Sequence, residues 1–212
     1  MLRIPSTSTL TLPIERRQRS KYLAWTVMAA ATISVVLYSE VPLFRQPEEK
    51  AHLQALRWIL LPHIVAGTLA FLTGPLQFSN RLRRLRLKFH RILGRIYVGS
   101  VFIAAPLAIL STAYSNYPKA IYFKVAIAIQ GGTWVLTTGV AFLAAVNRRI
   151  AMHREWMIRS YAVTFTFVGT RVLQPIPAWN HLGRFKFAMA IICITGLAVL
   201  VPQMIRLLRR PV

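Results

Sequence analysis

The stretch His90-Arg91-Ile92-Leu93-Gly94-Arg95-Ile96-Tyr97 opens a long apolar run that continues to Ala113. A second stretch, His153-Arg154-Glu155-Trp156-Met157-Ile158-Arg159-Ser160-Tyr161, opens another apolar run and repeats the order histidine-arginine, arginine, tyrosine. Basic residues at the edges of apolar runs are typical of membrane helices, because the connecting loops carry Lys and Arg. The repeated signature therefore predicts an all-α membrane protein built around two similar helical hairpins.

Composition also favours a membrane protein. Of the 212 residues 55% are hydrophobic, which is more than the core of a soluble domain of this length needs. A transmembrane helix needs roughly 20 apolar residues. Six runs reach or approach that length: Tyr22–Ser39, Trp58–Phe78, Ile92–Ala113, Val125–Val146, Met157–Ile176 and Phe187–Ile205. The first run follows a basic segment and lacks a small-residue cleavage site, so we interpret it as an uncleaved signal anchor.

The basic residues lie between the apolar runs rather than along one face. A net charge of +22 would suggest nucleic acid as the partner of a soluble protein, but this placement indicates membrane topology instead. Nineteen of the 27 Lys and Arg residues fall in the two terminal segments, in the second and fourth loops, or in the first turn of the run that follows each of these loops. Because basic loops stay in the cytoplasm, we predict six spans in a bacterial cytoplasmic (inner) membrane with both termini cytoplasmic. We expect anionic lipid at the basic face.

The chain is predicted to contain one membrane domain. Residues 1–21 read as a basic cytoplasmic tail, and residues 22–212 as a single helical transmembrane domain with its core at residues 58–180. Within that core, the second and third spans would form one hairpin and the fourth and fifth spans its duplicate. Two hairpins with this parallel topology would be related by an axis along the membrane normal.

A second echo supports the duplication. Gly67-Thr68 and Thr73-Gly74 in the second span have counterparts in Gly132-Thr133 and Thr138-Gly139 in the fourth span. Small residues spaced on one helix face allow another helix to approach closely. Chance similarity between two basic helix starts is the alternative to a duplication.

The histidines of the repeated signature, His90 and His153, are the leading candidates for a metal or cofactor site. Neutral imidazole is a ligand of haem iron, zinc and copper, and a haem held by two histidines needs one on each side of its flat ring. Tyr97 and Tyr161 lie about two turns further along nearly the same helix faces, so they are candidate cofactor contacts. The sequence therefore predicts haem b at this pair. The alternative is that both histidines lie in the lipid headgroup region and bind no cofactor, as is common for histidines beside arginine.

His63 and Arg171 are candidates for a separate site near the opposite membrane surface, with Gln130 at a similar level. Ionisable groups inside a membrane are costly and face the bundle interior or a cavity. No acid within a span neutralises Arg171, so carbonyls, water, a lipid phosphate or a ligand carboxylate must do so. His63 is also a candidate ligand of a second, outer cofactor.

No motif of a known enzyme class is present. The sequence contains no HExxH, CxxC, phosphate-binding glycine loop or serine nucleophile motif. Its single cysteine, Cys193, excludes a disulfide within the chain. Glu155 is the only acid near the repeated signature, and it can orient His153 or pair with Arg159 one helical turn later. The sequence decides neither for nor against catalysis.

The two His-Arg stretches resemble a family of predicted bacterial integral membrane proteins that is described only as a domain of unknown function. The resemblance also includes His63, the run Gly74-Pro75-Leu76-Gln77-Phe78 and Arg171. The resemblance covers about residues 58–180. It implies a helical membrane protein with histidines at these positions, and it carries no established substrate, cofactor or activity. A likeness to four-helix haem-b cytochromes is one of architecture alone.

These observations lead to three functional hypotheses. The first is a membrane redox protein that binds haem b through His90 and His153 and exchanges electrons with quinone. The second is a small transporter or lipid-binding protein that uses Arg171 and His63. The third is a structural subunit whose basic face docks anionic lipid or an acidic partner. The ligand, the electron partner and the oligomeric state do not follow from the sequence.

Overall fold

The computed structural model of the chain describes residues 56–115, 121–172 and 183–208, together with the isolated positions 26, 27, 30, 33 and 176. These ranges contain helices and short turns and no strand. In chain order the helices are α4 (Arg57–Gln77), α5 (Asn80–Leu85), α6 (Leu87–Tyr114), α7 (Ile121–Val146), α8 (Ile150–Val172) and α10 (Gly183–Leu208). The prediction of an all-α fold is confirmed.

Four of the helices are long and apolar enough to cross a membrane: α4, α6, α7 and the part of α10 at Phe185–Met204. Helix α8 has 23 residues, which at 1.5 Å per residue covers a hydrocarbon core about 30 Å thick. It is more polar than the others because Glu155, Arg159 and several hydroxyl side chains lie on it. The first predicted span, Tyr22–Ser39, and the predicted tail lie outside the described residues except at the helical positions 26, 27, 30 and 33.

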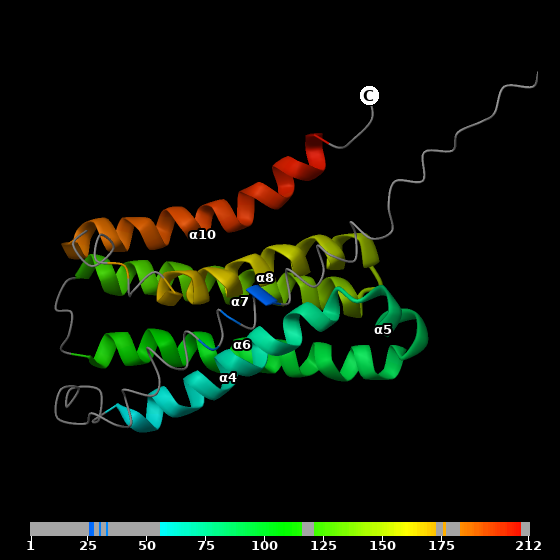
Figure 1. The fold of residues 1–212 in the computed structure, drawn as a ribbon, viewed down its shortest axis with the longest axis horizontal. Coiled ribbons are helices and arrows are strands. Elements are labelled where there is room, and N and C mark those ends of the chain that lie inside the picture. The colour runs from blue at the N-terminus through cyan, green and yellow to red at the C-terminus, as the bar shows by residue number, and fades with distance from the viewer. Residues whose placement is uncertain are drawn as a thin grey trace, which may run out of the picture.

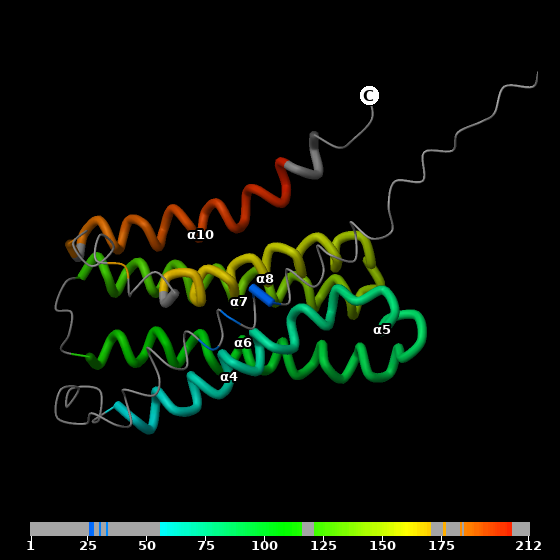
Figure 2. Tube along the Cα trace, in the orientation of Figure 1, coloured from blue at the N-terminus to red at the C-terminus, as the bar shows by residue number. Residues whose placement is uncertain are grey.

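Helices α4, α6, α7 and α8 form a four-helix bundle (Figures 1 and 2). Each packs against the next in chain order, and α8 returns to α4 along a shorter seam, so α6 and α8 are diagonal partners across the core. Helix α10 lies outside this bundle against α7 and α8, and its C-terminal half diverges from them in Figure 1. The predicted core of two successive hairpins thus matches the α4–α6 and α7–α8 pairs.

The polarity of the bundle is that of a membrane protein, with large apolar side chains on the outside. On α4, for example, Val65, Leu69 and Leu72 are exposed, whereas Ala70 and Thr73 are buried. A soluble domain does not expose so much contiguous apolar surface. These outward faces are suited to contact with lipid, and the polar side chains of the bundle turn inward.

The two hairpins are closed by different connections. Between α4 and α6 stands the short helix α5, whose first turn is capped by Ser79 Oγ, which accepts a hydrogen bond from the Leu82 amide at 3.2 Å. Between α7 and α8 the chain turns within three residues, and Arg148 adopts a positive φ of 57°. The Arg149 amide donates to the Ala144 carbonyl at 2.8 Å, which closes α7 in the manner usually seen with glycine.

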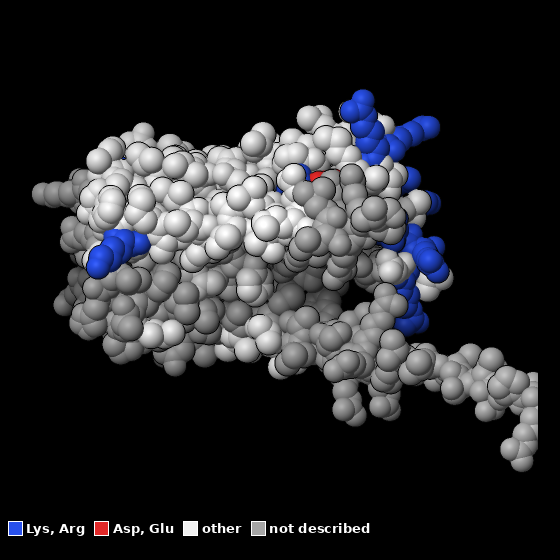
Figure 3. Space-filling view, turned by 90° about the horizontal axis from the view of Figure 1, so that it is seen from above, with Lys and Arg blue, Asp and Glu red and all other residues white. Residues whose placement is uncertain are grey.

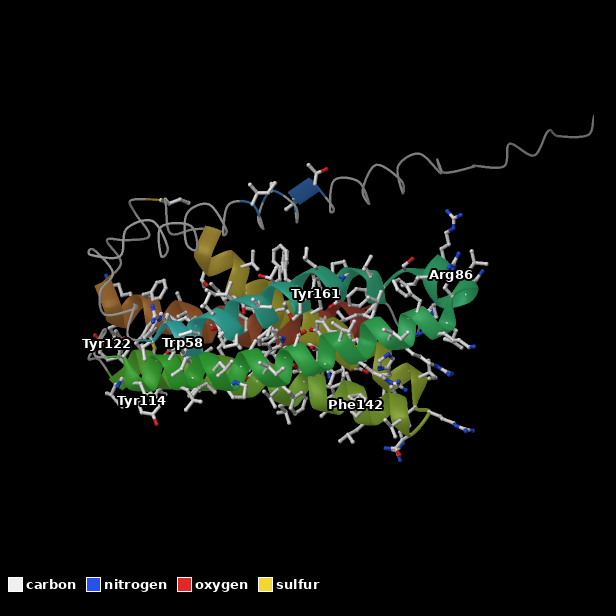
Figure 4. All side chains as sticks on the ribbon, turned by 90° about the horizontal axis from the view of Figure 1, so that it is seen from below. Trp58, Arg86, Tyr114, Tyr122, Phe142 and Tyr161 are labelled. Atoms are coloured by element: carbon white, nitrogen blue, oxygen red, sulfur yellow. The ribbon has the colours of Figure 1, made fainter. Side chains whose placement is uncertain are left out.

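The two ends of the bundle carry different side chains. Trp58, Tyr114 and Tyr122 lie together at one end, which we call the aromatic end, and Arg86 lies at the other (Figure 4). That other end, the basic end, is formed by α5, the start of α6 and the α7–α8 turn, and Lys and Arg side chains gather there (Figure 3). The basic residues of these segments are Arg81, Arg83, Arg84, Arg86, Lys88, Arg91, Arg148, Arg149 and Arg154.

Candidate functional site

The two histidines of the repeated signature both lie at the basic end. His90 stands in the first turn of α6 and His153 in the first turn of α8, so they come from diagonal helices. Their imidazoles are close enough to interact electrostatically. The structure therefore brings together the pair that the sequence predicts as metal ligands.

His153 is held in a defined orientation. Its Nδ1 lies 2.9 Å from the carbonyl oxygen of Ala141 in the neighbouring helix α7. A carbonyl only accepts, so Nδ1 must carry the proton and donate it. In the neutral ring the lone pair then belongs to Nε2, which is the arrangement seen when a histidine binds a metal through Nε2 and a backbone carbonyl fixes the other nitrogen.

His90 differs, since its Nδ1 is buried and has no hydrogen-bond partner within the described part of the chain. The same is true of Nε2 of Gln77, the last residue of α4, which is only 8% exposed. A Cβ atom placed on Gly94, one turn after His90, would lie 3.2 Å from Gln77 Oε1. The Gln77 amide thus packs against α6 beside His90. We refer to Gln77, His90 and His153 as the basic-end site.

The electrostatic surroundings of the basic-end site are positive. Arg83 and Arg91 both act on His90 through their charges. The only acid among the described residues is Glu155, and it pairs with Arg159 at 2.6 Å. The positive end in Figure 3 therefore lacks an internal counter-charge in that part of the chain, which favours a ligand with acceptor oxygens or negative charge.

Arg159 joins α8 to α10 and takes no part in the basic-end site. Its side chain is almost fully buried, with an ion pair to Glu155 and a second hydrogen bond from Nη2 to Gln203 Oε1 at 3.0 Å. The guanidinium also lies over the Trp156 ring, 4.6 Å from its centroid. Of the two partners that the sequence allows for Glu155, the structure shows an ion pair with Arg159. The counterpart of Arg159 in the first signature is Arg95, and its side chain is exposed.

Tyr97 anchors a buried network of hydroxyl groups in the middle of the bundle. Its hydroxyl lies 2.7 Å from Ser160 Oγ and 2.9 Å from Thr164 Oγ1, both on the diagonal helix α8. Trp134 Nε1 of α7 donates to Thr164 Oγ1 at 2.8 Å, and Thr138 Oγ1 lies 2.7 Å from Ser160 Oγ. These five side chains, which we call the hydroxyl network, tie three helices together where water has no access.

The five side chains of the hydroxyl network carry one donor proton fewer than the number of hydrogen-bond contacts that they make. Thr164 donates to the Ser160 carbonyl and Thr138 to the Trp134 carbonyl, because carbonyls only accept. Ser160 must then donate to Thr138, and Tyr97 remains the only donor for both Ser160 Oγ and Thr164 Oγ1. Its single proton is shared between two acceptors. Tyr97 is thus fully committed inside the bundle, on the same side of α6 as His90.

Tyr161 lies against Gly74 of α4. A Cβ atom on Gly74 would collide with the Tyr161 ring and would also lie 3.3 Å from Cε2 of Tyr97. The Tyr161 ring packs near Phe71 and Phe78, with centroid separations of 6.5 and 5.7 Å. The two tyrosines of the repeated signature therefore meet at one glycine, and that glycine allows α4 to approach them.

The echo of small residues is not equivalent in the two hairpins. A Cβ on Gly139, the counterpart of Gly74, would lie 3.7 Å from Phe102, which is an ordinary contact. Gly67 and Gly132 have nothing within 4 Å of that position. The close approach predicted for the small-residue faces is confirmed only at Gly74, and the duplication itself stays a prediction.

The outer residues of the sequence analysis are only partly described. His63 Nδ1 donates to the Ala104 carbonyl of α6 at 2.8 Å, so this ring is also oriented by a backbone oxygen. Gln130 donates to Thr166 at 2.9 Å inside the bundle. Arg171 lies in the last turn of α8, and its side chain is outside the described residues, so a site formed by His63 and Arg171 stays a prediction.

The donor set suits some metals better than others. Among the described residues no group of three or more His, Cys, Asp or Glu side chains is placed to hold a metal ion. A closed zinc site with four protein ligands is thus not formed in these ranges. Two imidazoles from diagonal helices suit a metal whose remaining ligands come from a macrocycle, as in a haem held by two histidines.

Sequence reasoning missed Gln77 as a site residue and missed the hydroxyl network apart from Tyr97. Ser160 and Thr164 are four residues apart on α8, and Trp134 and Thr138 are four apart on α7. Such spacing places each pair on one helix face. Polar side chains at this spacing inside apolar runs were the available signal. No signal of this kind marks Gln77, because its position beside His90 depends on how α4 packs on α6.

Residues 60–206 match a family described as "Predicted membrane protein (DUF2306)". The chain belongs to this family. No curated protein and no solved structure matches it. DUF2306 membership agrees with the resemblance noted from the motifs and extends it to residue 206, so that α10 is included. The chain is thus a membrane protein whose family has no assigned function.

Proposed function

We propose that this protein binds haem b between α6 and α8 at the basic end, with His90 and His153 as axial ligands, and that it transfers electrons. The observation that supports this most strongly is that two imidazoles, each in the first turn of one of two diagonal helices, lie at the same end of the bundle and within electrostatic range of each other. Diagonal helices stand further apart than neighbours, which leaves room for a flat ring between two side chains. Haem held by these two histidines would supply one-electron transfer, since both axial positions would be taken by protein side chains.

The state of His153 supports the proposal. The Ala141 carbonyl fixes its ring and leaves the Nε2 lone pair for a metal. The haem would be of the b type, because covalent attachment needs a pair of closely spaced cysteines and Cys193 is the only one in the chain. Arginines at the basic end would pair with the two carboxylates of the ring.

The hydroxyl network limits where the ring can lie. Tyr97 is fully buried and bridges α6 to α8 about two turns from the histidine level. The arginines of the basic end would therefore be the residues that hold the haem carboxylates. Contacts of Tyr97 and Tyr161 with the cofactor stay a prediction.

The test is a reduced-minus-oxidised visible spectrum of the full-length protein, purified from haem-replete cells. We expect a Soret band and an α band that sharpens on reduction. A flat spectrum in both regions would overturn the proposal. Zinc or copper content of the same samples identifies a metal held by the two histidines without a macrocycle.

We propose further that the basic end faces the cytoplasm of a bacterial inner membrane and contacts anionic lipid there. Its excess of Lys and Arg over the aromatic end supports this orientation. Cysteine labelling from each side of sealed cells tests it, with Arg84→Cys and Tyr114→Cys as the two reporters in a Cys193→Ser background. Labelling of Arg84→Cys from outside would contradict the orientation.

The transporter or lipid-binding function with Arg171 and His63, and the role as a structural subunit, remain hypotheses from the sequence. No contact among the described residues favours either over the haem proposal.

A further inference from the structure

The Gln77 side chain is the least explained polar group of the bundle. It is more than nine-tenths buried, and its Nε2 has no hydrogen-bond partner in the described ranges. A buried donor that lacks an acceptor costs about 1–3 kcal/mol, so such groups in folded proteins call for a water, an ion or a ligand. His90 Nδ1, one turn from the Gly94 position against which this amide packs, is in the same condition.

The residues next to Gln77 along α4 border an aromatic seam, since Phe78 follows it directly and Gly74, about one turn earlier, lies against the Tyr161 ring of α8. Phe71, Phe78 and Phe165 surround the Tyr161 ring or pack on each other, with Phe71 and Phe165 centroids 6.0 Å apart. They line the seam between α4 and α8, which is the shortest of the four seams that close the bundle. Phe78 and Phe165 are 42% and 36% exposed, so this seam opens toward the lipid.

From these contacts we infer that the α4–α8 seam binds the ring of a lipid-soluble quinone, with a ring oxygen hydrogen-bonded to Gln77 Nε2 beside His90. Ligand sites of this kind combine apolar walls with a few placed polar groups. A quinone oxygen accepts from the amide, and the flat ring packs against Phe78 and Tyr161. The positive surroundings of His90 favour an electron-rich oxygen over a cation. A role as electron partner of the haem rests on the proposed function, whereas binding of the quinone does not.

The test uses the full-length protein in detergent, titrated with decyl-substituted benzoquinone and followed by quenching of tryptophan fluorescence. Gln77→Leu removes the donor and is expected to weaken binding about tenfold, because the ring oxygen would lose its partner in a buried site. Gln130→Leu is the matched control. It is an equally buried glutamine nearer the aromatic end, and its partner Thr166 keeps a second bond to the Val163 carbonyl.

Saturable binding by the wild type and by Gln130→Leu, with the loss confined to Gln77→Leu, supports the site. Linear quenching by the wild type, equal affinities for wild type and Gln77→Leu, or an equal loss in both variants overturns it, and the Gln77 amide then holds only a water. Gln77→Leu replaces an unpartnered donor with an apolar group of similar size, so folding is expected to survive. If Gln77→Leu does not fold, Gln77→Met removes the same donor and is measured in its place.

The two proposals fail separately. The absorbance of each sample in the Soret region is recorded before titration. A Soret band without quinone binding removes the quinone site and leaves the haem proposal. Quinone binding sensitive to Gln77→Leu in samples that lack the band removes the haem proposal and leaves the site.

Discussion

The two His-Arg signatures are nearly identical in sequence and differ in what the fold does with them. In the second copy His153 is fixed by a backbone carbonyl and Arg159 is buried in an ion pair. In the first copy His90 has a buried nitrogen without a described partner, and Arg95 is exposed. The second copy thus ties neighbouring helices together through His153 and Arg159, whereas the described residues offer no such contacts to His90 Nδ1 or Arg95 of the first copy.

The difference follows from the position of each helix. Helix α8 packs against both α7 and α10, and each supplies a partner: the Ala141 carbonyl of α7 contacts His153, and Gln203 of α10 contacts Arg159. The first turns of α6 face α4 and the short helix α5 at the end of the bundle. The helices next to α8 supply hydrogen-bond partners for its polar side chains. The corresponding side chains of α6 have no such partners among the described residues.

The largest expected difference is between the two arginines. Arg159→Met should lower the free energy of unfolding by about 3 kcal/mol, because it removes a buried ion pair and leaves Glu155 without that charge. Arg95→Met should change it by less than about 0.5 kcal/mol, since the side chain is exposed. Unfolding of both variants in mixed detergent–SDS micelles measures this. The double variant Glu155→Gln/Arg159→Met should recover part of the loss, and equal effects of the two single variants would contradict the account.

The second comparison is between the matched glycines. Gly74→Ala should cost about 2 kcal/mol, because its methyl group meets the Tyr161 ring. Gly139→Ala should be neutral or stabilising by up to about 1 kcal/mol, as its methyl group makes an ordinary contact and alanine favours the helix. Thermal unfolding in detergent ranks the pair. The cost at Gly74 should fall when Tyr161 is leucine, and a cost that persists there would argue against the contact.

The smallest expected difference in stability lies within the hydroxyl network, between Tyr97 of the first hairpin and Thr164 of the second. Thr164→Val should cost about 2 kcal/mol, because it leaves the buried Trp134 N–H without its acceptor. Tyr97→Phe should cost about 1 kcal/mol, since every remaining donor of the network keeps an acceptor. Unfolding curves of the two variants decide the order. A larger loss for Tyr97→Phe would show that the proton assignment is wrong.

Much of the fold follows from the sequence because the apolar runs are long and their edges are basic. The predicted runs Trp58–Phe78 and Val125–Val146 correspond to α4 and α7 within a few residues. Helix α6 begins earlier than the run predicted from Ile92, at Leu87. Lys88, His90 and Arg91 precede the apolar segment and still belong to the helix, since a helix need not end where the lipid ends.

The candidate site was less predictable. The pairing of His90 with His153 and that of Glu155 with Arg159 follow from topology and from helix spacing. The roles of Gln77 and Gly94 do not, because they depend on the packing of α4 on α6, which no local pattern records. The different surroundings of Gly74 and Gly139 show the same limit, as equal sequence spacing meets unequal neighbours.

Haem binding by His90 and His153 is tested most directly by the haem content per chain of three single variants. His90→Ala and His153→Ala should each lose the Soret band. His63→Ala, a histidine also oriented by a backbone carbonyl but distant from the basic end, should keep the wild-type content. Equal haem content in all three variants, or loss in His63→Ala alone, would contradict the account.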